Sequence, residues 1–347
     1  MKLKLFIWLL LTFANTFIGK TQINLDTTYF QSFLQELSIQ DENLFIVGEA
    51  HDVKSTLATE FFIIKNLAKK INTIYIEGGK SEAELLNIFL KTGDSTILNY
   101  TRARKTNSDY KVFLDSIYAL NKKNKLTFYG FDFERPVCVG YLFSKWFLNV
   151  KMNNNLNMDS LSQHIISSDE IESKTLEDVR KKSWKLQLVF DKLKTSFYEN
   201  EDEYEDILDS NLYTFKQIIF NPVKANFNTR DKNFANTMLH YEKTKGLGNS
   251  IIIVGSDHLV TKQSFIPLLL GKLPKKYSIY SFFFIYKNCE STDNNGIKIY
   301  NSKKQLLPFL RKESENLPSI NFYISQEQLI PTKNKKMKTV ITEFYNQ

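Results

Sequence analysis

Two segments of this sequence share a pattern that restricts the possible fold: a short apolar run, a glycine, two further residues and a histidine. They read LFIVGEAH at 44–51 and IIIVGSDH at 251–258. Each run is short and rich in β-branched residues, which predicts a strand covered on both faces within a parallel sheet. The glycine allows the chain to turn sharply at the carboxyl end of the strand. The repeat therefore places His51 and His258 at the edge where open α/β sheets bind their ligands.

Alternating strand and helix patterns predict the rest of the sheet. Further strands are expected at 73–76, 126–130 and 279–286, and helices at 55–70, 81–91, 109–122 and 230–243. Ser81-x-x-Glu84 has the form of a capping box at the start of a helix, and Gly93 is a suitable C-terminal cap. This order is typical of an α/β fold with a parallel-type central sheet and flanking helices.

Two regions depart from the alternation. The segment at about 141–228 has helical patterns but no convincing strand, so we expect a helical insertion within a single domain of residues 22–347. From Gly296 onward the pattern is weak, and we expect short strands or helices packed on the outside.

Residues 1–21 have the form of a secretory signal peptide. Lys2 and Lys4 precede an apolar run from Leu5 to Phe17, and small and polar residues follow. The alternative is a membrane anchor, but the run is shorter than the roughly 20 residues that span a bilayer. We therefore expect an exported protein, periplasmic or secreted, with no stable membrane anchor.

The distribution of charge and cysteine excludes some classes of partner. The 46 basic and 38 acidic residues are scattered along the chain. Since no basic stripe is interleaved with aromatic residues, nucleic-acid binding is not expected. Cys138 and Cys289 either form one disulfide in an oxidising compartment or remain thiols, and their spacing is not that of a zinc site.

Acidic, basic and histidine side chains follow the ends of the predicted strands. Because the carboxyl ends of parallel strands meet at one edge, these residues can converge although they are far apart in the sequence. They are Glu49 and His51, Glu77, Asp132 and Glu134, Asp257 and His258, with Arg230 and Asp231 at the start of a helix. A histidine beside carboxylates can act as a general base or a metal ligand. For Glu134 and Asp231, capping of the next helix is an equal alternative.

These motifs together resemble the erythromycin esterase family. The resemblance rests on Gly48-Glu49-Ala50-His51, Glu77, the segment 86–93, Gly130-Phe131-Asp132, Arg230-Asp231 and the closing Gly-x-x-His. That family belongs to a superfamily with the ChaN-type haem-binding lipoproteins and the Tiki and TraB proteins. The resemblance implies a hydrolase in which His51 activates water with the help of Glu49 and Glu77, while His258 and Arg230 bind or polarise the substrate. Asp52 follows His51 where the esterases usually have glycine, which is nearer to the ChaN type.

We therefore expect an enzyme that hydrolyses an ester or related acyl bond of a small molecule without a metal or other cofactor. Five further side chains are expected to contact substrate: Asp52, Asp132, Glu134, Asp231 and Asp257. Neither a Gly-x-Ser-x-Gly elbow nor a His-Glu-x-x-His motif is present, which argues against a serine hydrolase and a common zinc protease. The alternatives are a haem- or iron-binding protein with His51 and His258 as ligands, and a metal-dependent peptidase like the Tiki proteins.

Overall fold

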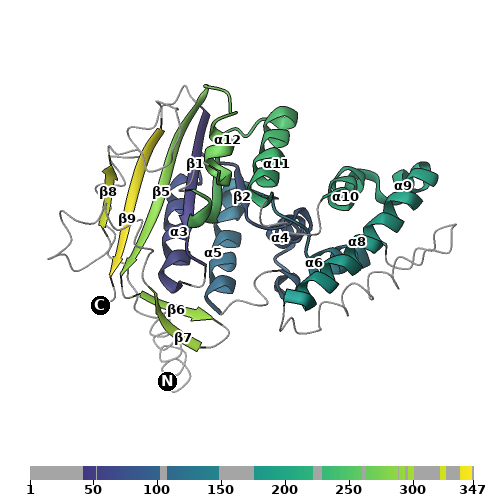
Figure 1. Cartoon of the computed structure of the whole chain (residues 1–347), viewed down its shortest axis with the longest axis horizontal. Helices are drawn as coiled ribbons and strands as arrows, with labels where there is room; N and C mark the ends of the chain where they lie inside the picture. The colour runs from purple at the N-terminus through teal and green to yellow at the C-terminus, as the bar shows by residue number, and fades with distance from the viewer. Residues whose placement is uncertain are drawn as a thin grey trace, which may run out of the picture.

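A seven-stranded sheet is the centre of the molecule (Figure 1). The structure is a computed structural model that describes residues 42–51, 53–101, 108–147, 176–221, 229–259, 263–287, 289–293, 296–300, 321–325 and 337–345. The predicted signal peptide at 1–21 and Asp52 lie outside these residues. The order of strands in the sheet is β3-β2-β4-β1-β5-β9-β8.

Six neighbouring strands of the sheet are parallel, and β8 is antiparallel to β9. The strands are β1 (Glu42–Glu49), β2 (Thr73–Ile76), β3 (Thr127–Gly130), β4 (Ser250–Gly255), β5 (Tyr277–Lys287), β8 (Asn321–Ser325) and β9 (Met337–Tyr345). A separate antiparallel pair consists of β6 (Cys289–Asp293) and β7 (Gly296–Tyr300). The expected α/β class is thus confirmed. The expectation that the C-terminal segment packs outside is wrong for β9, which lies between β5 and β8 and whose β-branched and aromatic residues suit a strand.

The two copies of the repeated motif form adjacent strands. In the register of β1 with β4, Gly48 lies beside Val254 and Glu49 beside Gly255. Because the two strands are parallel and end together, the residues that follow them leave the sheet at the same edge. The short 3-10 helix η4 (Ser256–His258) begins directly after β4. His51 and His258 therefore start from neighbouring positions.

Helices cover both faces of the sheet. They are α3 (Lys54–Leu67), α4 (Lys80–Thr92), α5 (Ser108–Asn124), α6 (Pro136–Trp146), α8 (Leu176–Glu199), α9 (Glu201–Leu208), α10 (Leu212–Ile219), α11 (Arg230–Lys245) and α12 (Phe265–Leu270), with 3-10 turns η1 (Ser95–Tyr100) and η3 (Asp209–Asn211). Phe45 and Val47 of β1 face the core formed with α3, α4 and α5, whereas Leu44 and Ile46 face α11 and α12. This alternation is what a strand buried on both faces requires.

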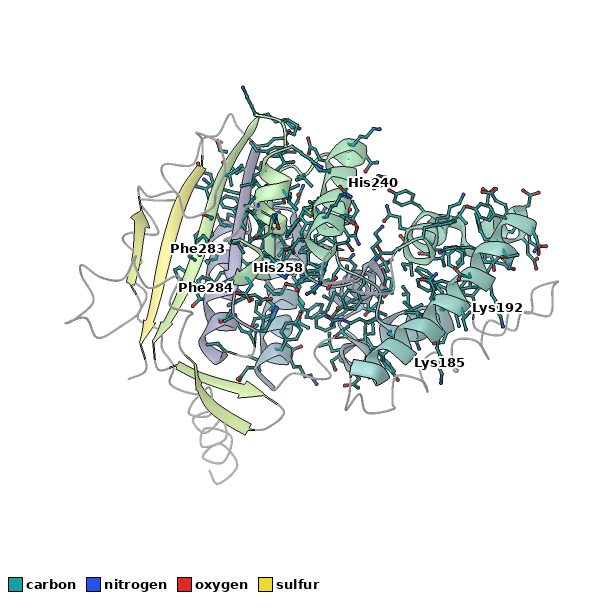
Figure 2. All side chains as sticks on the ribbon, in the orientation of Figure 1. Lys185, Lys192, His240, His258, Phe283 and Phe284 are labelled. Carbon is teal, nitrogen blue, oxygen red and sulfur yellow. The ribbon has the colours of Figure 1, made fainter. Side chains whose placement is uncertain are left out.

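Between β3 and α11, the described residues are helical and extend to one side of the sheet (Figure 1). Aromatic side chains join α6, α8, α9 and α10, with Phe147, Phe197 and Tyr204 around Phe215. Lys185 and Lys192 are exposed on α8 (Figure 2). No helix among the described residues has both the length and the apolar character needed to cross a membrane.

Two smaller expectations concern the ends of α4 and the cysteines. Gly93 is the C-terminal cap of α4, with φ of 74° and its N–H bonded to the carbonyl of Phe89, as expected. The prediction of a capping box at Ser81 is wrong, because the N-terminal cap of α4 is Gly79, which has no side chain to bond to the helix. Cys138 is buried on α6, and the side chain of Cys289 lies outside the described part of the chain.

Candidate active site

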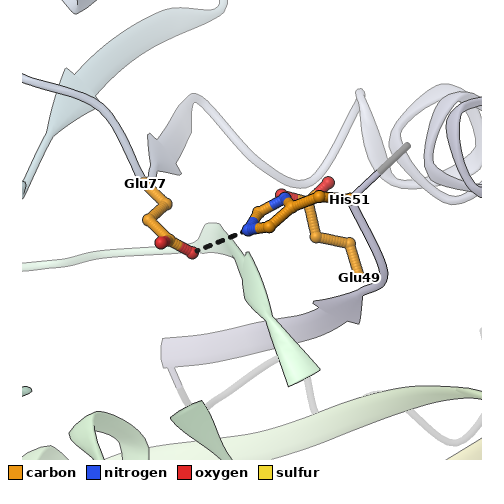
Figure 3. Close-up of side chains that lie close together, drawn as sticks. All are labelled: Glu49, His51 and Glu77. Carbon is orange, nitrogen blue, oxygen red and sulfur yellow. Dashed lines mark ion pairs between the residues drawn. The ribbon is translucent and has the colours of Figure 1, made fainter. Parts of the chain in front are cut away.

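Glu49, His51 and Glu77 come together at the carboxyl edge of the sheet (Figure 3). Nδ1 of His51 lies 3.1 Å from Oε1 of Glu49, and Nε2 lies 3.7 Å from Oε2 of Glu77. The side chain of His51 is 48% exposed, whereas those of Glu49 and Glu77 are 10% and 4% exposed. An imidazole that solvent can reach is thus held between two carboxylates that solvent hardly reaches.

Glu77 joins the two histidine motifs. Its Oε2 accepts a hydrogen bond from the backbone N–H of Gly255 at 2.8 Å, and its Oε1 accepts one from Nη2 of Arg230 at 2.7 Å. Nε2 of His258 lies 3.6 Å from the same Oε1. Burial alone raises the pKa of Glu77, but the contact with His258 and the charges of both histidines and Arg230 bring that pKa well below its usual value. Glu77 is therefore a carboxylate at neutral pH.

Gly255 is needed in the second motif for space rather than for a turn. Its φ is −53°, a value that any residue adopts. A Cβ at this position would lie 3.2 Å from Nε2 of His51, 3.4 Å from Oε2 of Glu77 and 3.5 Å from Cδ2 of His258. The absence of a side chain thus lets the backbone N–H of Gly255 come within hydrogen-bonding distance of Glu77. The sequence pattern gave no sign of this contact.

Arg230, the first residue of α11, neutralises two buried carboxylates. Its Nη2 donates to Oε1 of Glu77 and to Oδ2 of Asp132, both at 2.7 Å. Its guanidinium carbon also lies 4.9 Å from the centre of the ring of Phe234. Burial raises the pKa of Asp132, and Arg230 opposes that rise. Burial lowers the pKa of Arg230, but the bonds to Asp132 and the charge of Glu77 raise it overall. The guanidinium therefore orients the acids of the site.

Asp231 lies against the second histidine. Its Oδ1 makes a short contact with Nδ1 of His258, whose ring packs against that of Phe234. Burial lowers the pKa of His258, but the hydrogen bond with Asp231 and the contact with Glu77 raise it to about 9. His258 is consequently an imidazolium at neutral pH. The N-terminal cap of α11 is Thr229, so the alternative in which Asp231 caps its own helix is wrong. Figure 2 shows His258 inside the α/β body, whereas His240 is exposed on α11.

The carboxylate of Glu134 contacts the start of α4. Glu134 is 1% exposed, and its carboxylate accepts hydrogen bonds from the backbone N–H of Lys80, the backbone N–H and hydroxyl of Ser81, and Nδ2 of Asn221. Glu134 thus caps α4, a helix that begins before it in the chain. Burial raises its pKa. Asp257 is exposed on η4.

Asn221, which follows α10, connects the helical segment to the site and has no recognisable pattern in the sequence. Its Nδ2 donates to the backbone carbonyl of Asp132 at 2.8 Å and to Oε1 of Glu134 at 2.7 Å. The side chain is 7% exposed. The loop after β3 is therefore fixed from two sides, by Asn221 and by Arg230.

Comparison with known proteins supports the fold. No protein-family model and no curated protein matches the sequence. A mutant of the erythromycin esterase EreC in its open conformation is similar, with a TM-score of 0.51, 14% identity and coverage of 90% of this chain and 93% of that one. A succinoglycan biosynthesis protein has a TM-score of 0.54 and 11% identity, with 88% of each chain covered.

A third solved structure, ChaN of Campylobacter jejuni with cofacially bound haem, has a TM-score of 0.34 and 18% identity. It covers 73% of this chain and 85% of its own. At these identities the comparisons concern the fold alone. The resemblance to the erythromycin esterases that the motifs predicted is confirmed at that level: this chain has the α/β fold of an erythromycin esterase.

Proposed function

We propose that this protein is a hydrolase that cleaves an ester or related acyl bond of a small molecule with water activated by His51. The observation that carries the proposal is the placement of the two nitrogens of His51. Nδ1 lies within hydrogen-bonding distance of Glu49, while Nε2 lies 3.7 Å from Glu77. The second separation is too long for a direct hydrogen bond, and we infer that the attacking water binds beside both atoms.

In this reaction Nδ1–H of His51 donates a hydrogen bond to Glu49, which leaves the lone pair on Nε2 to act on the water. Water attacks the acyl carbon and transfers a proton to Nε2, and the tetrahedral intermediate then expels the alcohol, which takes up that proton. Glu49 stabilises the imidazolium that forms during attack. The carboxylate of Glu77, fixed by Gly255 and Arg230, orients the water.

His258 supplies the positive charge for the oxyanion. Its pKa of about 9 keeps it protonated at neutral pH, and its Nε2 is near Glu77 and therefore near the water. A fixed positive charge near developing negative charge is a large source of catalysis in a site of low dielectric. Arg230 already donates to Glu77 and Asp132, so we assign it the role of positioning these acids.

Several features favour hydrolysis over axial ligation of haem. A haem ligand needs a neutral imidazole with an accessible nitrogen. Here each nitrogen of His51 and His258 lies within 4.0 Å of a carboxylate oxygen, and His258 is held as a cation. We also propose, from the N-terminal segment 1–21, that the enzyme acts after export.

A metal-dependent hydrolase is the second candidate, because Glu49, His51 and Glu77 also fit a metal ion. One donor atom from each of these residues lies within 4.8 Å of the others. Carboxylate and imidazole are common ligands of catalytic zinc and related ions, and three protein ligands leave a position open for water. A bound ion would supply a Lewis acid and lower the pKa of that water.

The decisive experiment measures hydrolysis of a panel of aryl esters and lactones by the protein and by its His51→Ala variant. We expect loss of at least about a hundredfold in kcat, the usual contribution of a general base. Because His51 is half-exposed, the variant should unfold within a few degrees of the parent. Equal turnover by the two proteins would refute the assignment of His51.

A further inference from the structure

We propose that Lys80 binds an oxyanion of the substrate, a carboxylate on the acyl or alcohol part, beside the candidate active site. This inference rests on the proposed function and specifies its substrate class: esters that carry a negative charge. Lys80 is the first residue of α4 and follows Glu77 by three positions. At most roughly 10 Å of chain separates the two Cα atoms.

The ammonium of Lys80 has little compensation for its burial. The side chain is half-buried, and burial lowers its pKa, while the charge of Glu134 opposes the change. No carboxylate of the described residues lies within 4.0 Å of its Nζ. Glu84, one helical turn further along, is also too far away for an ion pair and is influenced by Asn87 and Lys91 instead. Among the described side chains, Lys80 thus has the attraction of Glu134 but no close ion pair.

The location of Lys80 makes this unpaired charge more unusual. A cation in the first turn of a helix is unfavourable, because the helix dipole is positive at that end. The backbone N–H groups of Lys80 and Ser81 are already bonded to Glu134, so the helix end itself has no free donors there. Since a residue that breaks a local rule often serves function, we assign the anion to the ammonium and not to the helix end.

The ammonium lies near one member of a tyrosine group formed by Tyr129, Tyr213 and Tyr241. Nζ of Lys80 lies 6.0 Å from the ring centre of Tyr241, whose hydroxyl donates to the carbonyl of Gly130. Tyr129 contacts that ring and is half-buried, and Tyr213 of α10 is 60% exposed. The charge of Tyr213 raises the pKa of both Tyr129 and Tyr241, which places it near them. These rings suit an aromatic group that carries a carboxylate.

The tyrosine group and the active site share one structural element. Gly130, which accepts the bond from Tyr241, ends β3, and Asp132 follows two residues later as a partner of Arg230. A Cβ at Gly130 would lie 2.1 Å from the carbonyl oxygen of Gly79, so this strand end is packed against the turn that carries Lys80. The turn from Glu77 to Lys80 thus connects the proposed anion site to the candidate active site.

The test compares an anionic ester, 3-acetoxybenzoate, with its neutral counterpart, methyl 3-acetoxybenzoate. For each, kcat/KM is measured with the parent and with Lys80→Met. We expect the preference for the anionic ester to fall about tenfold or more in the variant, because the carboxylate loses a charged hydrogen-bond donor. Lys80→Arg should recover most of that preference. An unchanged ratio in Lys80→Met would overturn the proposal.

Lys245 provides a matched control. Its Nζ lies 5.6 Å from the centre of the same Tyr241 ring, but from the opposite end of α11 to Arg230. Lys245→Met should leave the preference unchanged; an equal loss in both variants would mean that net charge, and not Lys80, decides it.

Equilibrium binding of the product 3-hydroxybenzoate separates this inference from the proposed function. Weaker binding by Lys80→Met than by the parent and Lys245→Met supports the anion site even if neither ester is hydrolysed. Equal binding by all three, or no binding by the parent, refutes it.

Discussion

Asp231 binds Nδ1 of His258 while Nε2 of the same ring lies 3.6 Å from Oε1 of Glu77, so one imidazole joins a residue of α11 to the acid that follows β2. Both partners are acidic and His258 is largely buried, which explains why its pKa is raised to about 9 in spite of burial. The ring is fixed at both nitrogens in the charged form. The pair of Asp231 and His258 therefore makes the charge of the site dependent on pH.

We predict that activity declines as pH rises through about 9, where His258 loses its proton. Asp231→Asn removes one of the interactions that raise this pKa, so the alkaline limb of the kcat/KM profile should move to lower pH. The profile is measured between pH 5 and 10 with a neutral ester. An alkaline limb at the same pH in both proteins would show that another group is responsible.

The same group links pH to stability. The folded-state pKa of His258, about 9, lies above the ordinary value of 6.5, so its contribution is fully present below pH 6.5 and is lost as pH rises toward 9. Thermal unfolding of the parent should therefore show a decrease in Tm across this window. His258→Gln should have a smaller decrease there; an identical decrease in the variant would assign the effect to other groups.

Removal of Arg230 should destabilise the fold. Glu77 and Asp132 are almost completely buried, and Arg230 bonds to both, so Arg230→Met leaves two buried carboxylates without their shared counter-ion. We expect a loss of roughly 3–5 kcal/mol in the free energy of unfolding, measured with urea at pH 7. The loss should be smaller at pH 5, because the pKa of Asp132 is already raised and it protonates more readily without Arg230.

Lys276→Met is the control for Arg230. Lys276 bonds to Glu42 and Glu242 at the surface, with a side chain that is 45% exposed. Such surface pairs contribute about 0–1 kcal/mol, so this variant should unfold close to the parent. A similar effect of both substitutions would contradict the role of Arg230 as the counter-ion of buried acids.

Much of the fold follows from local patterns in the sequence, because β1 to β4 are short apolar runs that end at, or directly before, a glycine or an acid. The repeat also predicted that His51 and His258 leave the sheet at one edge. It did not predict that β4 lies between β2 and β1. This arrangement brings the backbone N–H of Gly255 to Glu77. Strand order depends on long-range packing, which a local pattern does not contain.

Individual roles within the site were harder to predict for the same reason. Glu134 and Asp231 both follow or begin an element, so a contact with substrate and a helix cap were equally plausible. Their actual partners are Ser81, 53 residues away, and His258, 27 residues away. Asn221 bonds to Asp132, 89 residues away, and nothing in its neighbourhood in the sequence distinguishes it. Partners at such separations are set by the tertiary structure.

Glu134 tests this difference between a site residue and a structural one. Glu134→Gln keeps the shape of the side chain but replaces one accepting oxygen with an NH2 group. One carboxylate oxygen of Glu134 now accepts from Lys80 and Asn221, and the other accepts twice from Ser81. The variant therefore loses one of these two sets of bonds. We expect a loss of roughly 1–3 kcal/mol in the free energy of unfolding. The kcat for a neutral ester, per folded molecule, should change less than threefold. A large loss of kcat with unchanged stability would return Glu134 to the active site.

The two candidate mechanisms differ in their response to removal of metal. If His51 acts as a base without a metal, dialysis against a chelator should leave kcat/KM unchanged, and the purified protein should contain less than a tenth of an equivalent of zinc, manganese, iron or copper. If Glu49, His51 and Glu77 hold an ion, activity should fall on chelation and return with one specific metal. Glu49→Gln separates the cases further. In the metal-free enzyme it lowers kcat because Glu49 no longer stabilises the imidazolium, whereas in the metalloenzyme it also lowers the amount of metal bound.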